Sequence, residues 1–302
     1  MIRLLTALAA LLLAGPALAA PRCDVGAPGT AQRVAIGDTG RTVLIHVPAT
    51  ARETKRLPLI FLLHGSGGNG AAMLASSGLA ATADRHGFLV AAPDGGIPVG
   101  EGATKGFVWN IPGVPTITGK VPTAADADDV AFLTGAIDWL AAKGCADRRR
   151  VYATGLSGGG RMTSWLGCVA ADRFAAIAPV VGLRAGNPLA SDPQRPDPAT
   201  CKPARAMPVL AFAGDQDKVN PVEGGGAGYW QYPMAAALAR WAELGGCRAG
   251  PAAVLLSETA AEQRYTRCRR GARVTGHIVK GRGHEWVADN EAMWAFFARY
   301  RR

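Results

Sequence analysis

The sequence has no Cys-x-x-Cys pair and no cluster of cysteine and histidine residues at the spacing of metal ligands. A zinc site takes three or four such side chains from the protein. The sequence therefore predicts no metal site. Beyond its first 20 residues, the chain also lacks an apolar run long enough for a membrane-spanning helix, which needs about 20 residues. This second absence argues against stable insertion into a membrane.

Aromatic residues make up only 7% of the chain, and they do not alternate with basic residues along any segment. Lys and Arg nevertheless outnumber Asp and Glu by 33 to 23. A nucleic-acid-binding face combines clustered basic residues with such aromatics. Here the basic residues are scattered or form short groups such as Arg148-Arg149-Arg150, which favours a solvated surface and no nucleic-acid partner. Attraction to an acidic polymer or a cell envelope stays open.

The sequence also has no internal repeat and no linker long enough to separate two domains. What it does have at the start is a secretory signal peptide. A basic residue, Arg3, precedes an apolar stretch over residues 4–13, and Ala17-Leu18-Ala19 stands at the end of the signal peptide. Cleavage near Ala19 or Ala20 predicts a secreted or periplasmic protein. The remaining residues, 20–302, are expected to form a single catalytic domain.

An even number of cysteines remains after this cleavage, six in all. In an exported protein such a count predicts disulfides, and six cysteines allow 15 pairings. Cys247 and Cys268 flank one short segment and are the favoured pair. Cys168 with Cys201 is a second, weaker expectation. Cys23 with Cys145 is the pair that then remains, and other pairings stay open at this point.

Apolar runs alternate with helical patterns along the whole chain. A hairpin is expected over residues 33–36 and 42–47, and strands over 57–63, 88–92, 151–154, 174–181, 208–213 and 274–279. Helices are expected over 70–86, 126–143, 160–171, 232–244 and 290–301. This order predicts a doubly wound, mostly parallel sheet. Two Gly- and Pro-rich loops, 94–123 and 183–206, leave the carboxyl ends of strands, where open α/β sheets bind ligands.

The most informative motif is Gly155-Leu156-Ser157-Gly158-Gly159, which follows the apolar run over residues 150–154. A strand, G-x-S-x-G and a helix together form a nucleophile elbow, in which a sharp turn exposes the serine hydroxyl. The flanking glycines allow the close backbone approach that this turn requires. Ser157 is therefore the predicted nucleophile, provided that a histidine and a carboxylate reach it.

Chain order narrows the choice of partners, because such hydrolases place the acid and then the histidine after the serine. Of five histidines, three precede Ser157 and His277 lies inside a predicted strand. His284, in a glycine-rich loop after that strand, is the predicted base. Asp217, shortly after the strand over residues 208–213, is the predicted acid, and Asp215 in the same loop is the rival candidate.

Two backbone N–H groups are expected to bind the oxyanion of the reaction. One belongs to Gly158, the residue after the nucleophile, and the other to Ser66 in the loop His64-Gly65-Ser66-Gly67-Gly68. Two tryptophans, Trp109 and Trp230, lie in the loops around the site and could stack on a sugar or a cinnamoyl ring. The alternative, that they only pack these loops, stays equally open.

Several of these segments together resemble the secreted polyhydroxybutyrate depolymerase-like esterases, a family that includes feruloyl esterases and relatives of acetylxylan esterases. The resemblance covers nearly all of the chain after the signal peptide. The matching segments are residues 64–68 and 128–132, the elbow with its strand, Phe174 to Val180, Gly245-Gly246-Cys247, Tyr265-Thr266-Arg267-Cys268 and Gly283-His284.

The resemblance implies an α/β-hydrolase fold and serine carboxylesterase activity without a metal ion or organic cofactor. It assigns the nucleophile to Ser157, the acid to Asp217 and the base to His284. Family members often carry Asn, Ala or Tyr where this chain has Gly158, so a wider pocket floor is expected here.

The expected substrates are hydroxycinnamoyl or acetyl esters of plant cell-wall polysaccharide, and the substrate can be polymeric. One alternative is a depolymerase that acts on poly(3-hydroxybutyrate) or its oligomers. A third hypothesis is a hydrolase-like binding protein of the cell envelope without catalytic activity. The presence of Ser157, Asp217 and His284 argues against this third hypothesis, because binding requires none of them. The sequence leaves the oligomeric state open.

Overall fold

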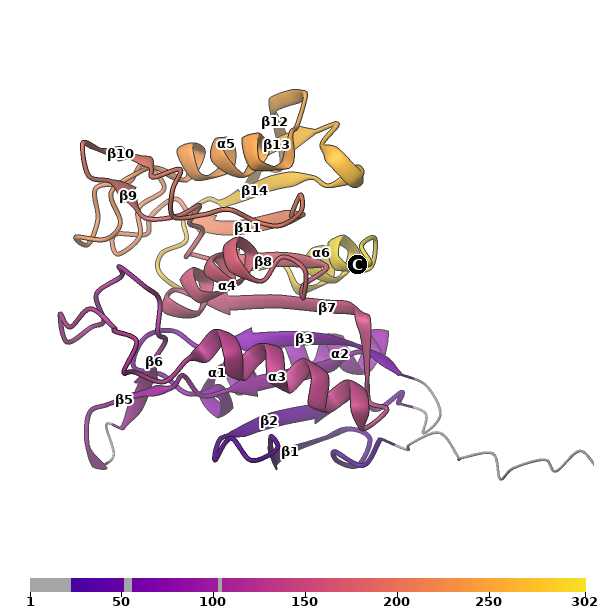
Figure 1. Ribbon diagram of the computed structural model, residues 1–302. Helices are drawn as coiled ribbons and strands as arrows, with labels where there is room; N and C mark the ends of the chain where they lie inside the picture. The colour runs from indigo at the N-terminus through magenta and orange to yellow at the C-terminus, as the bar shows by residue number, and fades with distance from the viewer. Residues whose placement is uncertain (1–22, 52–55, 103–104) are drawn as a thin grey trace, which may run out of the picture.

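The computed structural model of the protein describes residues 23–51, 56–102 and 105–302, so the predicted signal peptide lies outside the described residues. A ten-stranded sheet runs through the molecule (Figure 1). In order across the sheet, its strands are β1 (Thr30–Ala35), β2 (Thr42–Val47), β4 (Leu89–Pro93), β3 (Leu57–Leu63), β7 (Ala146–Leu156), β8 (Ala176–Val180), β11 (Val209–Gly214), β14 (Val274–Val279), β13 (Ala260–Thr266) and β12 (Ala249–Ser257).

The centre of the sheet, from β4 to β14, is parallel. The strands outside it, β1 and β2 at one end and β13 and β12 at the other, pair antiparallel. The predicted, mostly parallel α/β sheet is thus confirmed. All the parallel strands end at the same edge, and the loops that follow them therefore meet there.

Helices cover both faces of the sheet, and the strand β3 shows why. Its side chains are all buried and alternate between two apolar clusters, with Leu59 and Phe61 on one face and Ile60 and Leu62 on the other. The first face packs against α3 (Asp129–Ala142), α4 (Gly158–Val169) and α5 (Met234–Gly245), and the second against α1 (Gly70–Ser77), α2 (Leu79–His86) and α6 (Asn290–Phe297).

The prediction of a single helix over residues 70–86 is wrong. The chain forms two helices, α1 and α2, which are separated by Gly78. Gly78 has a φ of 68°, in the left-handed region that glycine adopts without the steric cost of a side chain. This glycine caps the end of α1, and α2 begins at the next residue.

The two long loops contain short hairpins that the sequence analysis did not predict. In the first loop, β5 (Ile97–Val99) pairs with β6 (Gly106–Val108), and in the second β9 (Pro188–Leu189) pairs with β10 (Asp192–Pro196). The Gly67 N–H donates to Phe107 O at 2.8 Å, and the Phe107 N–H donates to Gly68 O at 2.9 Å. The first hairpin is therefore joined to the glycine loop in which an oxyanion donor is expected.

Three disulfides join Cys23 to Cys145, Cys168 to Cys201 and Cys247 to Cys268. The favoured pair, the weaker expectation and the remaining pair of the sequence analysis are thus all present. The second bond ties the end of α4 to the loop over residues 183–206, so it fixes one wall of the region behind the predicted nucleophile.

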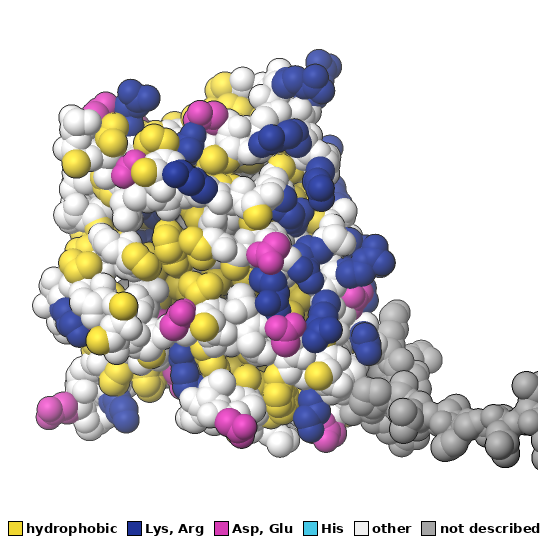
Figure 2. Space-filling view, in the orientation of Figure 1, with side chains coloured by type: hydrophobic (Ala, Val, Ile, Leu, Met, Phe, Trp, Pro, Cys, Tyr) yellow, Lys and Arg dark blue, Asp and Glu magenta, His cyan; other side chains and the backbone are white. Residues whose placement is uncertain are grey.

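The surface charge is uneven. Figure 2 shows Lys and Arg side chains gathered on the right of the molecule, at the end where β7 begins. Arg148 and Arg149, near that end of β7, are both exposed.

Within residues 23–51, 56–102 and 105–302, no helix is both long and apolar enough to cross a membrane. In the same ranges, no three His, Cys, Asp or Glu side chains are grouped to hold a metal ion.

Candidate active site

Ser157 lies at the turn between β7 and α4, with a φ of 53°. A backbone in this region costs about 1–3 kcal/mol for a residue with a side chain, and the surrounding structure must enforce it. The Ser157 N–H donates to Val180 O on the neighbouring strand at 2.9 Å. A Cβ added at Gly155 would lie 2.6 Å from Leu63 O, so the turn excludes a side chain there.

The predicted partners of Ser157 meet at the edge where the parallel strands end. His284 Nε2 lies 2.8 Å from Ser157 Oγ. His284 Nδ1 lies 2.8 Å from Asp217 Oδ2 and 3.1 Å from its Oδ1. With Nδ1–H donating to the carboxylate, Nε2 is the nitrogen that can accept the serine proton. Ser157 and His284 are 127 positions apart in the sequence, and Asp217 and His284 are 67 apart. The fold thus brings all three into one series of hydrogen bonds.

The Asp217 carboxylate is fully buried within this chain of contacts. Burial alone would raise its pKa, but the hydrogen bond to His284 and those from the N–H groups of Asn220 and Val219 outweigh this effect and lower the pKa. Asp217 is therefore ionised at neutral pH. A negative charge at this position favours the imidazolium that His284 would become during the reaction.

The rival acid, Asp215, lies elsewhere in the same loop. Its Oδ1 accepts a hydrogen bond from the Gly281 N–H at 2.7 Å, which joins the loop after β11 to the loop after β14. It thus helps to hold the His284 loop in place without contacting the imidazole. The structure favours Asp217 over Asp215 as the partner of His284.

The other four histidines are engaged away from Ser157. His46 contacts Asp84, His86 contacts Glu291 and His277 contacts Glu262, each through Nε2. His64 is buried under the glycine loop, and its Nε2 accepts a hydrogen bond from the Gly95 N–H at 2.9 Å. Burial lowers the pKa of His64, which keeps it neutral in this structural position.

Two backbone N–H groups beside Ser157 have no acceptor among the described residues, namely those of Gly158 and Ser66. Gly158 is the first residue of α4, where backbone N–H groups lack partners within the helix. Ser66 N lies 2.9 Å from the point where a Cβ on Gly158 would stand, so the two residues are adjacent. This pair can hold a developing oxyanion.

The expectation of a wider pocket floor at Gly158 is wrong. A Cβ at this position would overlap with Ser66 Oγ, because the Ser66 side chain already fills the space that the missing side chain leaves. Gly158 therefore lets the glycine loop approach α4 closely. The cavity that Gly158 and Ser66 line together with Arg161 is small, with about 10 Å³ of free space.

We expect Gly158→Ala to lower kcat by about 10²-fold, because the added Cβ must push Ser66 and its N–H out of position. Steady-state kinetics on a simple ester would measure this loss. Gly135→Ala is the matched control, since Gly135 lies in α3 with no atom within 4 Å of the added Cβ. That variant should keep full activity and gain about 0.5–1 kcal/mol of stability. Equal activity of both variants would contradict the assignment of the oxyanion site.

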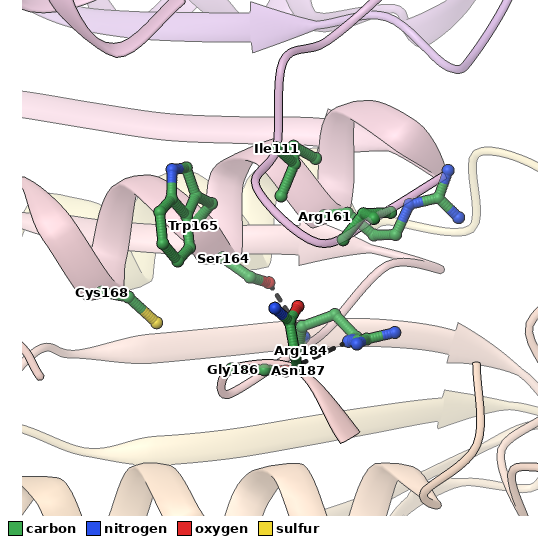
Figure 3. A pocket seen from close by; sticks show the side chains of 9 residues that line it. Ile111, Arg161, Ser164, Trp165, Cys168, Arg184, Gly186 and Asn187 are labelled. Carbon is green, nitrogen blue, oxygen red and sulfur yellow. Dashed lines mark hydrogen bonds between the residues drawn. The ribbon is translucent and has the colours of Figure 1, made fainter. Parts of the chain in front are cut away.

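The two tryptophans singled out from the sequence occupy different places. Trp109 is 4% exposed, donates from Nε1 to His64 O at 2.8 Å, and lines a small cavity beside Ser66. Trp230 is also 4% exposed and donates to Pro221 O at 2.9 Å. It does not line this cavity, nor a second one that lies farther along α4 beside Arg161 and Arg184 (Figure 3). Of the two, only Trp109 is placed beside the expected oxyanion donors.

The sequence analysis missed a further residue at this site, Arg161. It lies one helical turn after Ser157, its side chain is 5% exposed, and its Nη2 donates to Ser66 Oγ at 3.2 Å. The guanidinium also lies over the Tyr229 ring, 4.1 Å from its centre. The sequence carries no clear signal for this position, because α4 mixes polar residues such as Thr163 and Ser164 with apolar ones and its burial shows only in the structure.

Comparisons with known proteins bear on the fold that carries these residues. The model of the prolyl oligopeptidase family matches residues 124–185, which contain the elbow. In structure, the chain is similar to an acetyl xylan esterase from Aspergillus awamori, with a TM-score of 0.62, 16% identity and coverage of 89% of this chain and 99% of that one. The chain has the α/β-hydrolase fold.

In sequence, the chain is 31% identical over 267 residues to feruloyl esterase B of Piromyces equi, and the alignment covers 86% of this chain and 45% of that relative. In structure it is also similar to LpqC, a poly(3-hydroxybutyrate) depolymerase from Bordetella parapertussis, with a TM-score of 0.53, 19% identity and coverage of 90% and 94% of the two chains. The predicted resemblance to this group of esterases is confirmed. The chain spans about half the length of the curated relatives it matches.

Proposed function

We propose that this α/β-hydrolase is a serine esterase that hydrolyses carboxylic esters through an acyl-enzyme on Ser157. The observation that supports the proposal most directly is the unbroken chain of contacts from Asp217 through His284 to Ser157 Oγ. It stands beside two N–H groups without an acceptor, on Gly158 and Ser66. A nucleophile, a base with its orienting acid, and an oxyanion site are the parts that acyl transfer requires.

In the first step, His284 Nε2 takes the proton of Ser157 Oγ as this oxygen attacks the ester carbonyl carbon. The carbonyl oxygen becomes an oxyanion facing the N–H groups of Gly158 and Ser66. His284 then gives its proton to the leaving alcohol, and the acyl group stays on Ser157. In the second step the same histidine activates a water molecule, which releases the carboxylic acid and frees the serine.

For the substrate, we propose feruloyl or other hydroxycinnamoyl esters, or acetyl esters, of plant cell-wall polysaccharide. This follows the names of two proteins that the chain resembles, feruloyl esterase B and an acetyl xylan esterase. The similarity to a poly(3-hydroxybutyrate) depolymerase supports polyester or its oligomers as the second candidate.

We further propose that residues 1–19 are cleaved off and that residues 20–302 are exported as one catalytic domain. The three disulfides support this location.

A fluorophosphonate probe tests the mechanism without knowledge of the substrate. We expect the folded wild-type protein to be labelled at one residue, and Ser157→Ala to show no labelling, because Ser157 is the only serine of the described residues with a histidine within reach of its hydroxyl. Intact mass and in-gel fluorescence would measure the adduct. A folded wild type that fails to react, or a Ser157→Ala variant that reacts equally, would leave the non-catalytic binding protein as the better hypothesis.

The substrate class is tested by assays of one enzyme preparation on methyl ferulate, acetylated xylan, short p-nitrophenyl esters and poly(3-hydroxybutyrate). Under the first proposal, kcat/KM is higher for the ferulate or the acetylated xylan than for hydroxybutyrate oligomers. The reverse order would favour the depolymerase. Ser157→Ala measured in parallel corrects each rate for background hydrolysis.

A further inference from the structure

The edge of the sheet opposite Ser157 is rich in arginine, and the mechanism above makes no use of it. The parallel strands begin at this edge and end at the catalytic one. Strand β7 spans 11 residues, so at about 3.3 Å per residue the two edges lie about 30 Å apart. We call this surface the basic edge and define it by six exposed arginines, Arg148, Arg149, Arg267, Arg270, Arg273 and Arg299.

The end of the chain lies against the basic edge and adds to its charge. The Arg302 N–H donates to Arg149 O at 2.9 Å, and Arg302 Nε donates to Arg148 O at 3.1 Å. Figure 1 accordingly marks the C-terminus near the start of β7. Partial burial lowers the pKa of Arg302, and the charges of Arg173 and Arg148 lower it too, against the opposite effect of two nearby aspartates. Like charges are therefore held close together here.

The turn before β14 presents two of the six arginines in an unfavourable backbone conformation. Arg267 and Arg270 have φ values of 56° and 55°, in the left-handed region that glycine adopts at lower cost. Cys268, between them, is bonded to Cys247, which ties this turn to the end of α5. Both arginine side chains are exposed, so packing in the core does not explain why they stand where glycine would cost less.

Little negative charge offsets the basic edge. Arg148 lies 3.4 Å from an Asp138 oxygen, and Arg173 shares the same carboxylate at 2.8 Å. The other five arginines of the basic edge form no ion pair with any of the described residues. An exposed guanidinium without a counter-ion can bind an incoming anion without first breaking an ion pair. The basic edge is thus a surface open to a polyanion.

A groove between α6 and the strands β13 and β14 gives this surface a defined site. Its volume is about 280 Å³, at the lower end of the range for small-ligand sites. Arg273 and Arg299 line it without a partner, and Arg264 lines it with its Nη1 at 3.2 Å from Glu262 Oε1. Phe296 and two alanines of α6 supply apolar surface. One six-membered sugar ring fits here, with its carboxylate between the two free guanidinium groups.

The side chains of the basic edge favour a hydrated polymer over a lipid surface or a nucleic acid. Proteins that bind lipid surfaces insert apolar or aromatic side chains, and proteins that bind single-stranded nucleic acids stack aromatic ones on the bases. None of the Trp, Tyr or Phe side chains in the described ranges is exposed. All six residues of the basic edge are arginine, whose planar group pairs with a carboxylate through two parallel hydrogen bonds.

We propose that the basic edge binds a polysaccharide that carries carboxylates, a polymer of uronic acids, and that the groove holds one acidic sugar unit between Arg273 and Arg299. This inference goes beyond the proposed ester hydrolysis and does not depend on it, because the bound polymer lies at the edge opposite Ser157. The polymer is a support for the enzyme, and the catalytic edge stays free for the ester that is cleaved.

The test measures binding of polygalacturonate to the mature chain by biolayer interferometry, in the Ser157→Ala background. We expect binding to weaken at least about tenfold between about 20 and about 200 mM NaCl, because salt screens exposed charges. Arg273→Gln with Arg299→Gln should weaken binding by a further factor of about ten or more. Lys105→Gln with Arg195→Gln is the matched control. It removes the same charge from exposed residues beside β6 and on β10, at the other end of the molecule in Figure 1, and should keep the starting affinity.

Equal losses in the two double variants would overturn the proposal, because net charge alone would then account for the binding. Tighter binding to phosphatidylglycerol vesicles than to polygalacturonate would also overturn it, in favour of a lipid surface. A third measurement uses the wild-type enzyme. Saturating polygalacturonate should leave its hydrolysis of p-nitrophenyl acetate unchanged, and competitive inhibition would place the polymer at the catalytic edge instead. If wild type cleaves no ester but binds with the expected pattern, the proposed function fails and the basic edge stands.

Discussion

His284→Ala is expected to lower kcat for ester hydrolysis by about 10⁴- to 10⁶-fold, the range found when the base of such a triad is removed. The imidazole is the group placed to take the Ser157 proton, with Nε2 at 2.8 Å from the hydroxyl oxygen. Without it, the serine must attack as a neutral hydroxyl, and the leaving alcohol receives no proton. Steady-state assays with p-nitrophenyl acetate, corrected for the rate of Ser157→Ala, would measure the loss.

His86→Ala is the control for this experiment. His86 is a partly exposed histidine on α2 whose Nε2 contacts Glu291 of α6, and this contact includes no residue of the triad. Its replacement removes a surface contact of small energetic value and should leave kcat unchanged. If His284→Ala kept more than a tenth of wild-type kcat while remaining folded by circular dichroism, another group would have to be the base.

Asp217→Asn is expected to reduce kcat by about 10⁴-fold, while Asp215→Asn should cost less than tenfold. The carboxylate of Asp217 accepts the Nδ1 proton of His284 and so keeps Nε2 free for Ser157. An asparagine amide at this position can donate to Nδ1, which favours the wrong tautomer of the ring. The two substitutions are equal in chemistry and two residues apart, so their comparison isolates the effect of position.

Both variants require a check on folding, because each aspartate also accepts backbone hydrogen bonds. Asp217 Oδ1 accepts from the N–H groups of Val219 and Asn220, and Asp215 Oδ1 accepts from that of Gly281. The Asn variants keep an acceptor oxygen, and thermal unfolding should show modest losses in both. A larger loss of kcat in Asp215→Asn than in Asp217→Asn would move the acid to Asp215.

The positions of Ser157, Asp217 and His284 could be predicted from the sequence because topology brings them together. In a parallel sheet, residues just after different strands meet at one edge, whatever their distance in the chain. Chain order then left one histidine after the last predicted strand, and two aspartates in one loop. The choice between Asp215 and Asp217 depends on where the loop turns, which the structure resolves by placing Asp217 against the imidazole.

Other features had no clear signal in the sequence. Gly78 lies inside an apolar, helical pattern, and only its backbone conformation shows that it ends α1. The hairpin of β12 and β13 at the sheet edge exposes Leu255 and Leu256, so its side chains do not alternate between apolar and polar as in a half-buried strand. Sequence patterns report burial on one face, and an exposed edge hairpin lacks that pattern.

Arg161 was missed for a different reason. A charged residue on a helix is solvated in most proteins, and the sequence alone does not show that α4 is buried along almost its whole length. Burial of α4 follows from its position between β7, β8 and the two long loops, which depends on tertiary packing. The lining of the cavities beside Arg161 therefore could not be predicted from the elbow motif, although the chemistry of the nucleophile could.

The disulfide between Cys168 and Cys201 links the wall of the cavity beside Arg161 to the compartment in which the chain folds. Cys168 lines the cavity next to Arg161, and Cys201 anchors the segment that carries Arg184 and Asn187. A chain produced in a reducing cytosol would lack this bond while keeping the buried sheet that aligns the triad. Such a preparation should still react with serine probes, while the wall that this bond holds beside α4 would no longer be tied in place. An oxidising expression host is accordingly part of measuring its specificity, beyond any question of yield.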